Sequence, residues 1–585
     1  MKKISVVVLC FYINTCLLVA QTNYYVDGTN GSDDSVGTTL GKAWKTIQKA
    51  CNTAIPNSIV SIRGGVYHEN IIVTISGTKD SAITIKNFKN EVVMIDGTGT
   101  SGNTLIKIID KSYLNFENLT IQNLIKNEAQ GILVECTKNG IVTNLLFKNI
   151  IIKNISWTTN SSVIPTEYDN AQAFVAYGKG NKRSNPITNL TIDSCEVYEN
   201  ILGFSEAISL DGNIDGFIIK NNKIHHNTNI GILAAGNYKL SSIADLDHAR
   251  NGVVEKNELF FNVSDYATSA GIYMDGAQNV LIKNNRCYRN GYGIEVGCEE
   301  NGTTDSILVI NNLLYNNETA GLSVGGYTTT TTGQVLNCTF RNNTLFQNDY
   351  KNDAVGELNI MKASNCIFKN NIIYTNTTAV LFNVEAISPQ ENNSFDYNCW
   401  YTPQNNSNDI TANWKTATYS KFIDFQTSTT QDQHGFYNNP ILVDTAHSTL
   451  DFDLKDTSPC IDSGDVATII IAGELDFKNR KRISNNRIDI GAYEKGSVIL
   501  NVHNQPTHSI NSIYPNPTSK NVTIEMIEPF YETQLSLYDA KGQQLMNTKI
   551  KNGKMTLNME SFSAGVYFIR LVNKKTVELK KIIKQ

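Results

Sequence analysis

The sequence has 585 residues, a formal net charge of −5 and an isoelectric point near 6.0. A chain of this length exceeds one ordinary domain, so we expect a large core with accessory parts. The net charge excludes a general basic field of the kind that attracts nucleic acid. Only 18% of the residues are charged, and Asn, Thr, Ile and Gly are frequent, which is typical of strands joined by tight turns.

The first 20 residues, MKKISVVVLCFYINTCLLVA, contain two lysines, a short apolar run and a small residue, Ala20, at the end. This pattern predicts a secretory signal peptide, residues 1–20, because the apolar run is too short for a membrane anchor. No later stretch is apolar enough to span a bilayer. We therefore expect a mature chain without a membrane span, either secreted or held at the cell surface.

Eleven cysteines occur in the chain, and Cys10 and Cys16 leave with the predicted signal, so 11 − 2 = 9 remain. An odd number without a CxxC motif or paired histidines disfavours a disulfide framework and a zinc site. A single bridge, for example between Cys399 and Cys460, remains open.

Near the N-terminus, the stretches YYVDGTNGSDDS, AWKTIQKACNTA and SIVSIRGGVYHENIIV predict a strand, an amphipathic helix and the first turns of a repeat. The repeat is clearest in NNKIHHNTNIGILAAG, KNNRCYRNGYGIEVG and NNLLYNNETAGLSVGG. Each contains apolar residues, Asn-Asn, a turn, and two apolar residues alternating between glycines. The glycines that close successive phrases lie at 212, 236, 276, 297 and 325, so a unit of about two dozen residues carries insertions.

A short repeat of alternating strands and Asn or Gly turns predicts a solenoid of strands. One coil cannot bury its inward residues alone, whereas stacked coils bury a continuous apolar column. Repeated Asn at one turn can also form a ladder of side-chain amides. We predict an all-β chain with a right-handed parallel β-helix over residues 21–494, including an N-terminal cap at about 23–70. Because both ends of such a helix are capped, we expect a monomer.

The opening residues, together with SPCIDSGD (458–465) and RIDIGAYE (487–494), resemble the secreted bacterial β-helix proteins of the pectate-lyase-like superfamily. The resemblance covers residues 23–494 and implies the fold and a carbohydrate-active function, but not a particular substrate. The sequence lacks the clustered aspartates and the base motif of the well-known pectate lyase families, which makes pectate itself a doubtful substrate.

The C-terminal part is separate. Residues 495–511 are a predicted linker, and residues 512–585 alternate short strands with Asn-Pro and Lys-Gly turns, which predicts a small β-sandwich. The residues IYPNPTS and GVYFIRL, followed by a basic end, resemble the C-terminal sorting domain of the type IX secretion system of Bacteroidetes. That resemblance implies the type IX machinery as a partner and export across the outer membrane. An ordinary carbohydrate-binding sandwich is the alternative.

Several acidic residues recur at outward positions of the repeat. In each strand the apolar residues point inward, so Asp211, Asp275 and Glu295 point outward and are expected on one face. Asp211 and Asp275 should share one column about 9.6 Å apart, two rungs of roughly 4.8 Å, with Glu295 diagonal to Asp275 at about 8 Å. Outward carboxylates and Asp-Gly turns are also ordinary surface features. Their grouping favours a substrate cleft.

A long insertion, residues 237–252, follows one of these strands and would form a wall beside the face. It contributes three candidate catalytic residues, Lys239, His248 and Arg250. The residues predicted to bind substrate, by charge or by an aromatic ring, are Glu206, Tyr273, Glu299 and Tyr327.

Two reactions fit this face, and both have a polysaccharide as substrate. A glycoside hydrolase would use two of Asp211, Asp275 and Glu295 as acid and base, with a spacing suited to inversion. A lyase acting on a uronic acid polymer would hold Ca²⁺ on these three carboxylates and use Lys239, His248 or Arg250 as the base. The cofactor is therefore none or Ca²⁺. The alternative is a surface protein that binds a glycan without cleaving it.

Overall fold

The computed structural model describes residues 21–326, 333–446, 450–496, 510–526, 533–539, 544–550, 554–572 and 577–585. The chain divides into two compact units, residues 1–499 and 500–585, which are treated separately below. The predicted signal peptide and residues 497–509 of the predicted linker lie outside the described residues. None of the helices in the described ranges has the length and apolar character needed to cross a bilayer.

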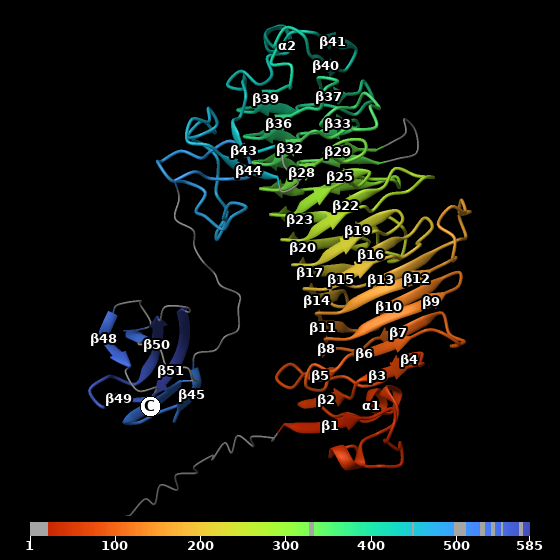
Figure 1. The fold of residues 1–585 in the computed structure, drawn as a ribbon, viewed down its shortest axis with the longest axis vertical. Helices are drawn as coiled ribbons and strands as arrows, with labels where there is room; N and C mark the ends of the chain where they lie inside the picture. The colour runs from red at the N-terminus through yellow and green to blue at the C-terminus, as the bar shows by residue number, and fades with distance from the viewer. Residues whose placement is uncertain are drawn as a thin grey trace, which may run out of the picture. The chain divides into compact units, whose positions relative to one another are not determined.

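The first unit is a stack of coils whose strands form three sheets along the stack (Figure 1). Equivalent strands of successive coils pair in parallel, which confirms the predicted parallel β-helix. We name the sheets by their roles. The groove sheet consists of β4 (Ile71–Val73), β7 (Thr104–Ile109), β10 (Ala129–Cys136), β13 (Ala171–Gly178), β16 (Glu206–Gly212), β19 (Ile230–Ala235), β22 (Ala270–Asp275), β25 (Tyr292–Gly297), β29 (Leu322–Gly325), β33 (Leu358–Ile360), β37 (Val380–Val384), β40 (Thr411–Trp414) and the antiparallel β41 (Ala417–Tyr419).

The other two sheets run beside it along the stack. The flank sheet consists of β3 (Gly65–Tyr67), β6 (Val93–Asp96), β9 (Thr120–Ile125), β12 (Ile151–Ser156), β15 (Glu196–Tyr198), β18 (Lys223–His225), β21 (Glu258–Phe260), β24 (Arg286–Tyr288), β28 (Leu313–Tyr315), β32 (Thr344–Phe346), β36 (Ile372–Tyr374), β39 (Cys399–Tyr401) and β42 (Phe436–Tyr437). The back sheet consists of β1 (Thr22–Val26), β2 (Ser58–Ile62), β5 (Ile83–Asn87), β8 (Leu114–Glu117), β11 (Val142–Lys148), β14 (Ile187–Asp193), β17 (Ile214–Lys220), β20 (Ala249–Glu255), β23 (Gln278–Lys283), β26 (Thr303–Asp305), β27 (Leu308–Ile310), β30 (Gln334–Leu336), β31 (Thr339–Arg341), β34 (Ala363–Ser364), β35 (Ile367–Lys369) and β38 (Ser394–Asp396).

Apolar side chains from all three sheets fill the interior. Because side chains alternate along a strand, the inward positions of consecutive coils form columns, such as Ile208, Ile232, Ile272 and Ile294. Each of these isoleucines is fully buried. Burying such a side chain stabilises a fold by about 1.5–3 kcal/mol, so the columns provide the main favourable term for stacking the coils.

Two ladders of buried asparagine amides run along the stack, whereas the sequence predicted only one. In each ladder the amide nitrogen of one Asn donates to the amide oxygen of the Asn one coil later. The first ladder contains Asn222, Asn257, Asn285, Asn312, Asn343, Asn371 and Asn398. The second contains Asn200, Asn227, Asn262, Asn290, Asn317 and Asn348.

Each ladder ends on a buried carboxylate. Asn398 donates to Asp432, and Asn348 donates to Glu357 through both its amide nitrogen and its backbone N–H. A carboxylate that accepts hydrogen bonds can complete such a ladder, since it needs no donor of its own when ionised. Burial nevertheless raises the pKa of Asp432 to about 7 and that of Glu357 to about 8.

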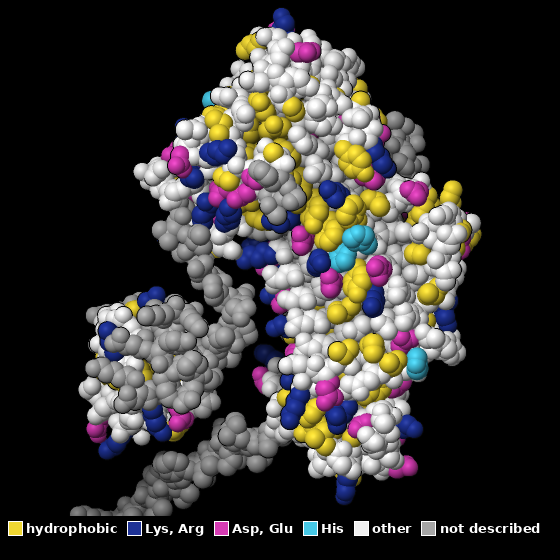
Figure 2. All heavy atoms as spheres, viewed as in Figure 1, with side chains coloured by type: hydrophobic (Ala, Val, Ile, Leu, Met, Phe, Trp, Pro, Cys, Tyr) yellow, Lys and Arg dark blue, Asp and Glu magenta, His cyan; other side chains and the backbone are white. Residues whose placement is uncertain are grey.

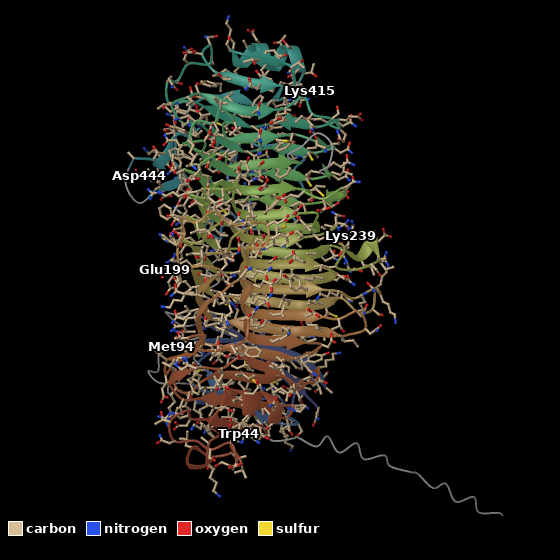
Figure 3. The ribbon with its side chains drawn as sticks, turned by 90° about the vertical axis from the view of Figure 1, so that its right-hand side faces the viewer. Trp44, Met94, Glu199, Lys239, Lys415 and Asp444 are labelled. Carbon is tan, nitrogen blue, oxygen red and sulfur yellow. The ribbon has the colours of Figure 1, made fainter. Side chains whose placement is uncertain are left out.

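Both ends of the coil stack are covered. At the N-terminal end lies α1 (Ile47–Thr53), where the Thr46 side chain accepts a hydrogen bond from the Lys49 N–H and so caps the helix. This order of strand, helix and first coils confirms the prediction. At the other end, α2 (Phe422–Thr429) packs Phe422 and Phe425 against the last coils. Figure 3 shows the stack in side view, with Trp44 in the first turns and Lys415 near the last.

After β42 the chain turns back along the flank sheet instead of adding another coil. We call residues 438–496, without 447–449, the arm; it contains the two-stranded antiparallel pair β43 (Leu442–Asp444) and β44 (Asp451–Leu454). The segments SPCIDSGD and RIDIGAYE belong to the arm. Its apolar side chains, among them Phe452 and Ile490, pack on Phe346 and Ile372 of the flank sheet. The buried ion pair of Arg341 with Glu474, with nitrogen and oxygen 2.6 Å apart, fixes it further.

Earlier in the stack the flank sheet carries a column of stacked rings. Ring centroids of successive members lie 4.7–5.1 Å apart with interplanar angles of 3–8°. The members are Tyr198, His225, Phe260, Tyr288 and Tyr315. Figure 2 shows hydrophobic and histidine side chains gathered near the middle of this face. Because the faces of the inner rings lie against neighbouring rings, we assign the column a structural role.

The second unit is a small antiparallel β-sandwich, as predicted for residues 512–585. One sheet orders β45 (Ile510–Tyr514), β46 (Asn521–Met526) and β49 (Lys554–Asn558). The other orders β48 (Gln544–Ile550), β47 (Thr533–Asp539), β50 (Gly565–Val572) and β51 (Val577–Lys584). The two sheets share one apolar core that includes Val522, Leu537 and Ile569.

Candidate active site

The groove sheet brings the predicted acidic residues to one outer face. In its registers Asp211 pairs with Ala235, and Leu233 pairs with Tyr273, which in turn pairs with Glu295. Asp211 and Asp275 therefore lie at equivalent positions two coils apart, and Glu295 lies in the neighbouring column one coil further. The period-two alternation of the strands gives this arrangement, because the residues between them point into the apolar core.

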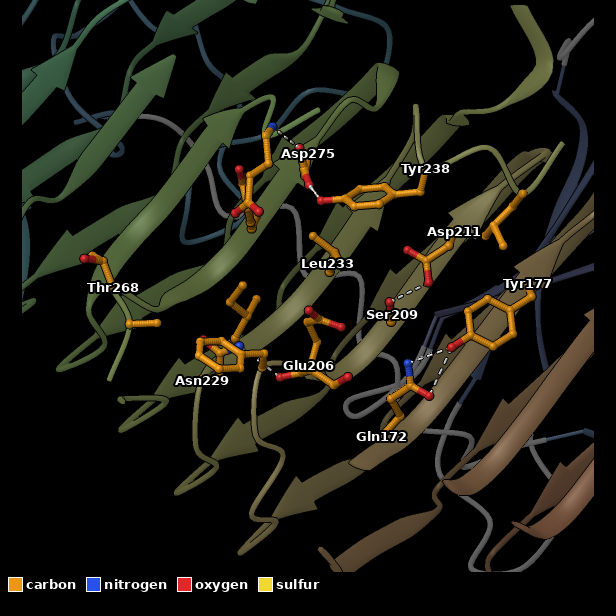
Figure 4. A pocket seen from close by; sticks show the side chains of 17 residues that line it. Gln172, Tyr177, Glu206, Ser209, Asp211, Asn229, Leu233, Tyr238, Thr268 and Asp275 are labelled. Carbon is orange, nitrogen blue, oxygen red and sulfur yellow. Dashed lines mark hydrogen bonds between the residues drawn. The ribbon is translucent and has the colours of Figure 1, made fainter. Parts of the chain in front are cut away.

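Asp211 and Asp275 do not lie on an open sheet surface but line a cavity of about 450 Å³ (Figure 4). The cavity has acidic, amide, hydroxyl and apolar lining. Its members are Gln172, Tyr177, Phe204, Ser205, Glu206, Ser209, Asp211, Asn229, Ile230, Leu233, Tyr238, Leu240, Ala267, Thr268, Tyr273, Asp275 and Glu299. Among these described residues there is no lysine, arginine or histidine, so the negative charge of the cavity has no cationic partner in its lining.

The floor of the cavity includes an apolar patch. Ile230, Leu233 and Tyr273 belong to a small buried cluster on the outer face of the groove sheet. Tyr273 was predicted as an exposed aromatic surface; its side chain is buried, with 3% exposed. A ring edge and aliphatic side chains of this kind can still contact the apolar face of a sugar inside the cavity.

Asp211 and Glu206 lie on the same strand, β16. Burial raises the pKa of Asp211 to about 7, although the Ser209 hydroxyl, which donates to the carboxylate at 2.9 Å, favours the ionised form. Burial also raises the pKa of Glu206 well above its ordinary range, and the nearby carboxylates of Asp211, Glu299 and Asp275 raise it further. Figure 4 shows the Glu206 side chain pointing into the cavity between Asn229 and Ser209. Burial and these neighbouring charges therefore favour the protonated form of Glu206.

Asp275, on β22, is held in place by two donors. The Tyr238 hydroxyl donates to one carboxylate oxygen, and the Glu299 N–H donates to the other at 2.7 Å. Burial and the negative charge of Glu299 raise the pKa of Asp275 to about 7, while the two hydrogen bonds oppose this increase. A carboxylate with both oxygens engaged has a fixed orientation, which is what a proton-accepting group requires.

Glu295 and Glu299 complete the acidic cluster. Glu299 lines the cavity, whereas Glu295 lies one coil beyond Tyr273 and is not part of the lining. Burial raises the pKa of both carboxyl groups, and for Glu295 the charges of Glu299 and Asp275 add to the effect.

The insertion at 237–252 covers the acids, as expected for a wall, but three of its predicted catalytic side chains are directed elsewhere. His248 lies buried with its Nδ1 at 2.7 Å from the Gly276 carbonyl. Arg250 belongs to the back sheet, where it pairs with Asp215 at 3.1 Å. The Lys239 side chain is exposed on a loop that projects from the stack (Figure 3). None of the three lines the cavity.

Tyr238 and Leu240 are the residues of this insertion that line the cavity, and neither was predicted from the sequence. The loop is fixed by Asp247, whose carboxylate accepts from the N–H groups of Lys239 at 2.6 Å and Ser241 at 2.8 Å. The sequence offered one signal for Tyr238, an aromatic side chain with a hydroxyl group beside an inserted turn. Gln172 and Tyr177 were also missed, because they lie on a coil without the repeated glycine phrase. Tyr327 lies outside the described residues.

The three carboxylates proposed to hold calcium do not form a cation site. Asp275 already accepts two hydrogen bonds, and Glu295 lies outside the cavity lining. In the described ranges no three His, Cys, Asp or Glu side chains are grouped as metal ligands would be. These residues therefore do not fit the Ca²⁺ required by the lyase alternative, and we derive no step through a metal.

A second cavity, of about 470 Å³, adjoins the first toward the N-terminal coils and shares Gln172, Tyr177 and Ser205 with it. Its floor is a row of hydrogen-bonded polar side chains. Thr104 donates to Gln130 at 2.9 Å, Gln130 donates to Gln172 at 3.0 Å, and the Gln172 amide donates to the Tyr177 hydroxyl at 2.8 Å. The two cavities together form an elongated depression along the groove sheet.

Both units match known protein families. The family described as "Right handed beta helix region" matches residues 149–345 and 270–414, and "Secretion system C-terminal sorting domain" matches residues 512–585. The handedness and the sorting domain predicted from the sequence are thereby confirmed. The sorting domain directs the chain through the type IX secretion system to the cell surface or the medium.

One relative covers most of the chain. The uncharacterized protein YwoF of Bacillus subtilis is 32% identical over 450 residues, which is 75% of this chain and 92% of the relative. Pectate lyase PEL9 of Emericella nidulans is 30% identical over 120 residues, covering 18% of this chain and 29% of that protein. Among solved structures, a lacto-N-biosidase from Eubacterium ramulus is 13% identical with a TM-score of 0.41, covering 65% of this chain and 64% of the other. The chain belongs to the family of right-handed β-helix proteins that includes YwoF, and it carries a C-terminal sorting domain.

Proposed function

We propose that the chain is an exported glycoside hydrolase that cleaves a polysaccharide in the cavity of the groove sheet. The observation that carries this proposal is the grouping of Glu206, Asp211 and Asp275 in one cavity, each with a raised pKa. Hydrolysis of a glycosidic bond requires one protonated and one ionised carboxyl group at the same site. The name of one relative, a pectate lyase, supports a polysaccharide as the substrate class.

The environment of each carboxyl group suggests its role. Burial and the charges of neighbouring carboxylates raise the pKa of Glu206 well above its usual range, so it is the proton donor to the leaving oxygen. Asp275 is the base, because hydrogen bonds from Tyr238 and from the Glu299 N–H stabilise and orient its anion. Asp211, bonded to Ser209, keeps Glu206 protonated by its negative charge. With these roles, Asp275 activates water on the face of the sugar opposite to Glu206.

Hydrolysis suits this cavity better than elimination. A lyase must neutralise the carboxylate of a uronic acid and then remove the C5 proton with a base. The candidate bases Lys239, His248 and Arg250 lie outside the cavity lining, and the lining acids would repel a uronate. A neutral glycan has no such penalty.

The test is incubation of the full-length protein with a panel of neutral and acidic polysaccharides. We expect new reducing ends without absorbance near 235 nm, which an elimination product would give. The variants E206Q and D275N should each lose at least about 100-fold in turnover, since general acid or base catalysis contributes roughly 10²–10⁴-fold. The control D245N changes an exposed carboxylate on the same insertion and should leave turnover unchanged.

Other results would decide against the proposal. Absorbance near 235 nm with acidic polymers would indicate a lyase. Binding of a glycan that E206Q and D275N retain, with no cleavage by the unmodified chain, would indicate a surface protein that only binds.

A further inference from the structure

Two cysteines from distant parts of the sequence lie together where the arm covers the last coils. Cys399 is on β39 of the flank sheet, and Cys460 is in the arm, 460 − 399 = 61 residues later. Both side chains are fully buried in one apolar cluster, and the two thiols are within hydrogen-bonding reach of each other. Among the described residues all nine cysteines are unbridged thiols.

We propose that Cys399 and Cys460 form a disulfide in the exported protein, and that this bond fastens the arm to the coil stack. Their facing positions come from two separate elements whose packing brings the side chains together. The sorting domain means that the chain passes through compartments in which disulfides form and persist. The bond is independent of the hydrolase proposal, since neither residue touches the acidic cavity.

A second thiol pair provides a geometric contrast. Cys338 and Cys366 also contact each other, but they occupy equivalent places on consecutive coils, because the neighbouring Thr339 and Ile367 are register partners. Parallel strands lie about 4.8 Å apart, so stacked side chains leave their Cβ atoms about that distance apart. The Cβ atoms of a disulfide lie about 3.5–4.5 Å apart, so the strand spacing is slightly too wide for this pair. The arm and β39 are not hydrogen-bonded neighbours in a sheet, and their separation is not set by the strand spacing.

The reaction is thiol–disulfide exchange with a disulfide-bearing oxidoreductase. One thiolate attacks the oxidoreductase disulfide, forming a mixed disulfide and releasing one of its thiols. The remaining thiolate of the Cys399–Cys460 pair then attacks the partner cysteine's sulfur in that mixed disulfide. This attack forms the new S–S bond and releases the second oxidoreductase thiol. Two thiols of this chain are oxidised, the oxidoreductase disulfide is reduced to a dithiol, and their two protons pass to that dithiol.

The environment of the pair indicates when the exchange occurs. Burial raises the pKa of the Cys399 thiol well above its ordinary value, and no oxidoreductase can reach it once the arm is docked. The exchange therefore takes place during folding, before the arm closes. The surrounding apolar side chains of Phe452, Leu454 and Ile490 then shield the bond from reductants.

The deciding experiment uses the full chain produced through an oxidising export route without added reductant. The protein is denatured in acid, its free thiols are alkylated without reduction, and its peptides are analysed by mass spectrometry. We expect the peptides of Cys399 and Cys460 to be joined and the other 9 − 2 = 7 cysteines to be alkylated. Alkylation of both Cys399 and Cys460 in the unmodified chain would overturn the proposal.

Variants add a second readout. In C460S we expect Cys399 to be alkylated, whereas C338S should keep the Cys399–Cys460 bridge. Reductant added during thermal unfolding should lower the midpoint of the unmodified chain and leave that of C460S unchanged; equal shifts in both would contradict the bridge. If C460S fails to fold, the peptide map of the unmodified chain still decides.

Discussion

Replacement of Asn312 by alanine tests whether the asparagine ladder stabilises the coil stack. Asn312 is fully buried, and its amide oxygen accepts from the backbone N–H of Asn285 at 2.9 Å and from the Asn285 amide at 3.0 Å. The alanine variant leaves the backbone N–H of Asn285 without this partner. The Asn285 amide keeps its bond to the Val254 carbonyl and loses the other.

The expected cost follows from these two donors. A buried donor without a partner costs about 1–3 kcal/mol, so two of them lower the free energy of unfolding by roughly 2–6 kcal/mol. The control N408A removes an exposed asparagine amide and should cost less than about 0.5 kcal/mol.

Urea unfolding followed by circular dichroism, with intrinsic fluorescence as a second probe, measures the difference between the two variants. If N312A unfolds at the same denaturant concentration as N408A, the ladder amides do not carry the energy assigned to them. A lower midpoint with an unchanged slope would support the loss of hydrogen bonds rather than a change in the unfolded state.

Three further predictions concern pH, the cavity and metals. The folded state raises the pKa of Asp211 to about 7, of Asp432 to about 7 and of Glu357 to about 8. Their contribution to stability is therefore complete below pH 4 and is lost as the pH rises toward 8. The thermal unfolding midpoint should fall between pH 5 and 8, and a rising midpoint would refute these shifts. The variant Y238F removes a hydrogen-bond donor to the Asp275 anion, which should raise the pKa of Asp275 and move the acidic limb of the pH–rate profile to higher pH. Turnover should fall about tenfold, as for the loss of a hydrogen bond to a charged group. An unchanged profile would show that Tyr238 takes no part in the reaction. Exhaustive chelation with EDTA should leave the rate of glycan cleavage unchanged, and loss of activity restored by Ca²⁺ would show that a metal takes part.

The sequence is sufficient for the coil stack because its signal is periodic. Asn-Asn recurs at 221–222, 284–285, 311–312, 342–343 and 370–371, and the alternation of apolar residues places Asp211 and Asp275 in one column. The second ladder was not foreseen because its members, such as Asn227 and Asn262, follow the strand and resemble ordinary turn residues. The course of the arm was missed because the coil repeat ends at β42, and its apolar residues carry no period that indicates their partner.

The direction of side chains in the insertion could not be predicted. Residues 237–252 have no repeat, and their path depends on bonds such as those from Lys239 and Ser241 to Asp247. As a result, His248 contacts the Gly276 carbonyl and Arg250 contacts the side chains of Asn213 and Asp215, while Tyr238 faces Asp275. The same loop contributes to the burial of the acidic side chains. The sequence pattern shows which strand residues point outward, but not which loop covers those residues.

The ladders also determine how a molecule of this kind can change in length. Each amide offers the same donor and acceptor to the next coil, so removing one complete winding, such as the 27 residues from Asn285 to Asn312, would join a donor to an equivalent acceptor. A cut that does not remove a whole winding would shift both asparagine ladders and the apolar columns out of alignment. Only the carboxylates at the ladder ends differ from the repeated amides. Related chains can therefore gain or lose whole windings in the middle of the stack while its two ends stay the same.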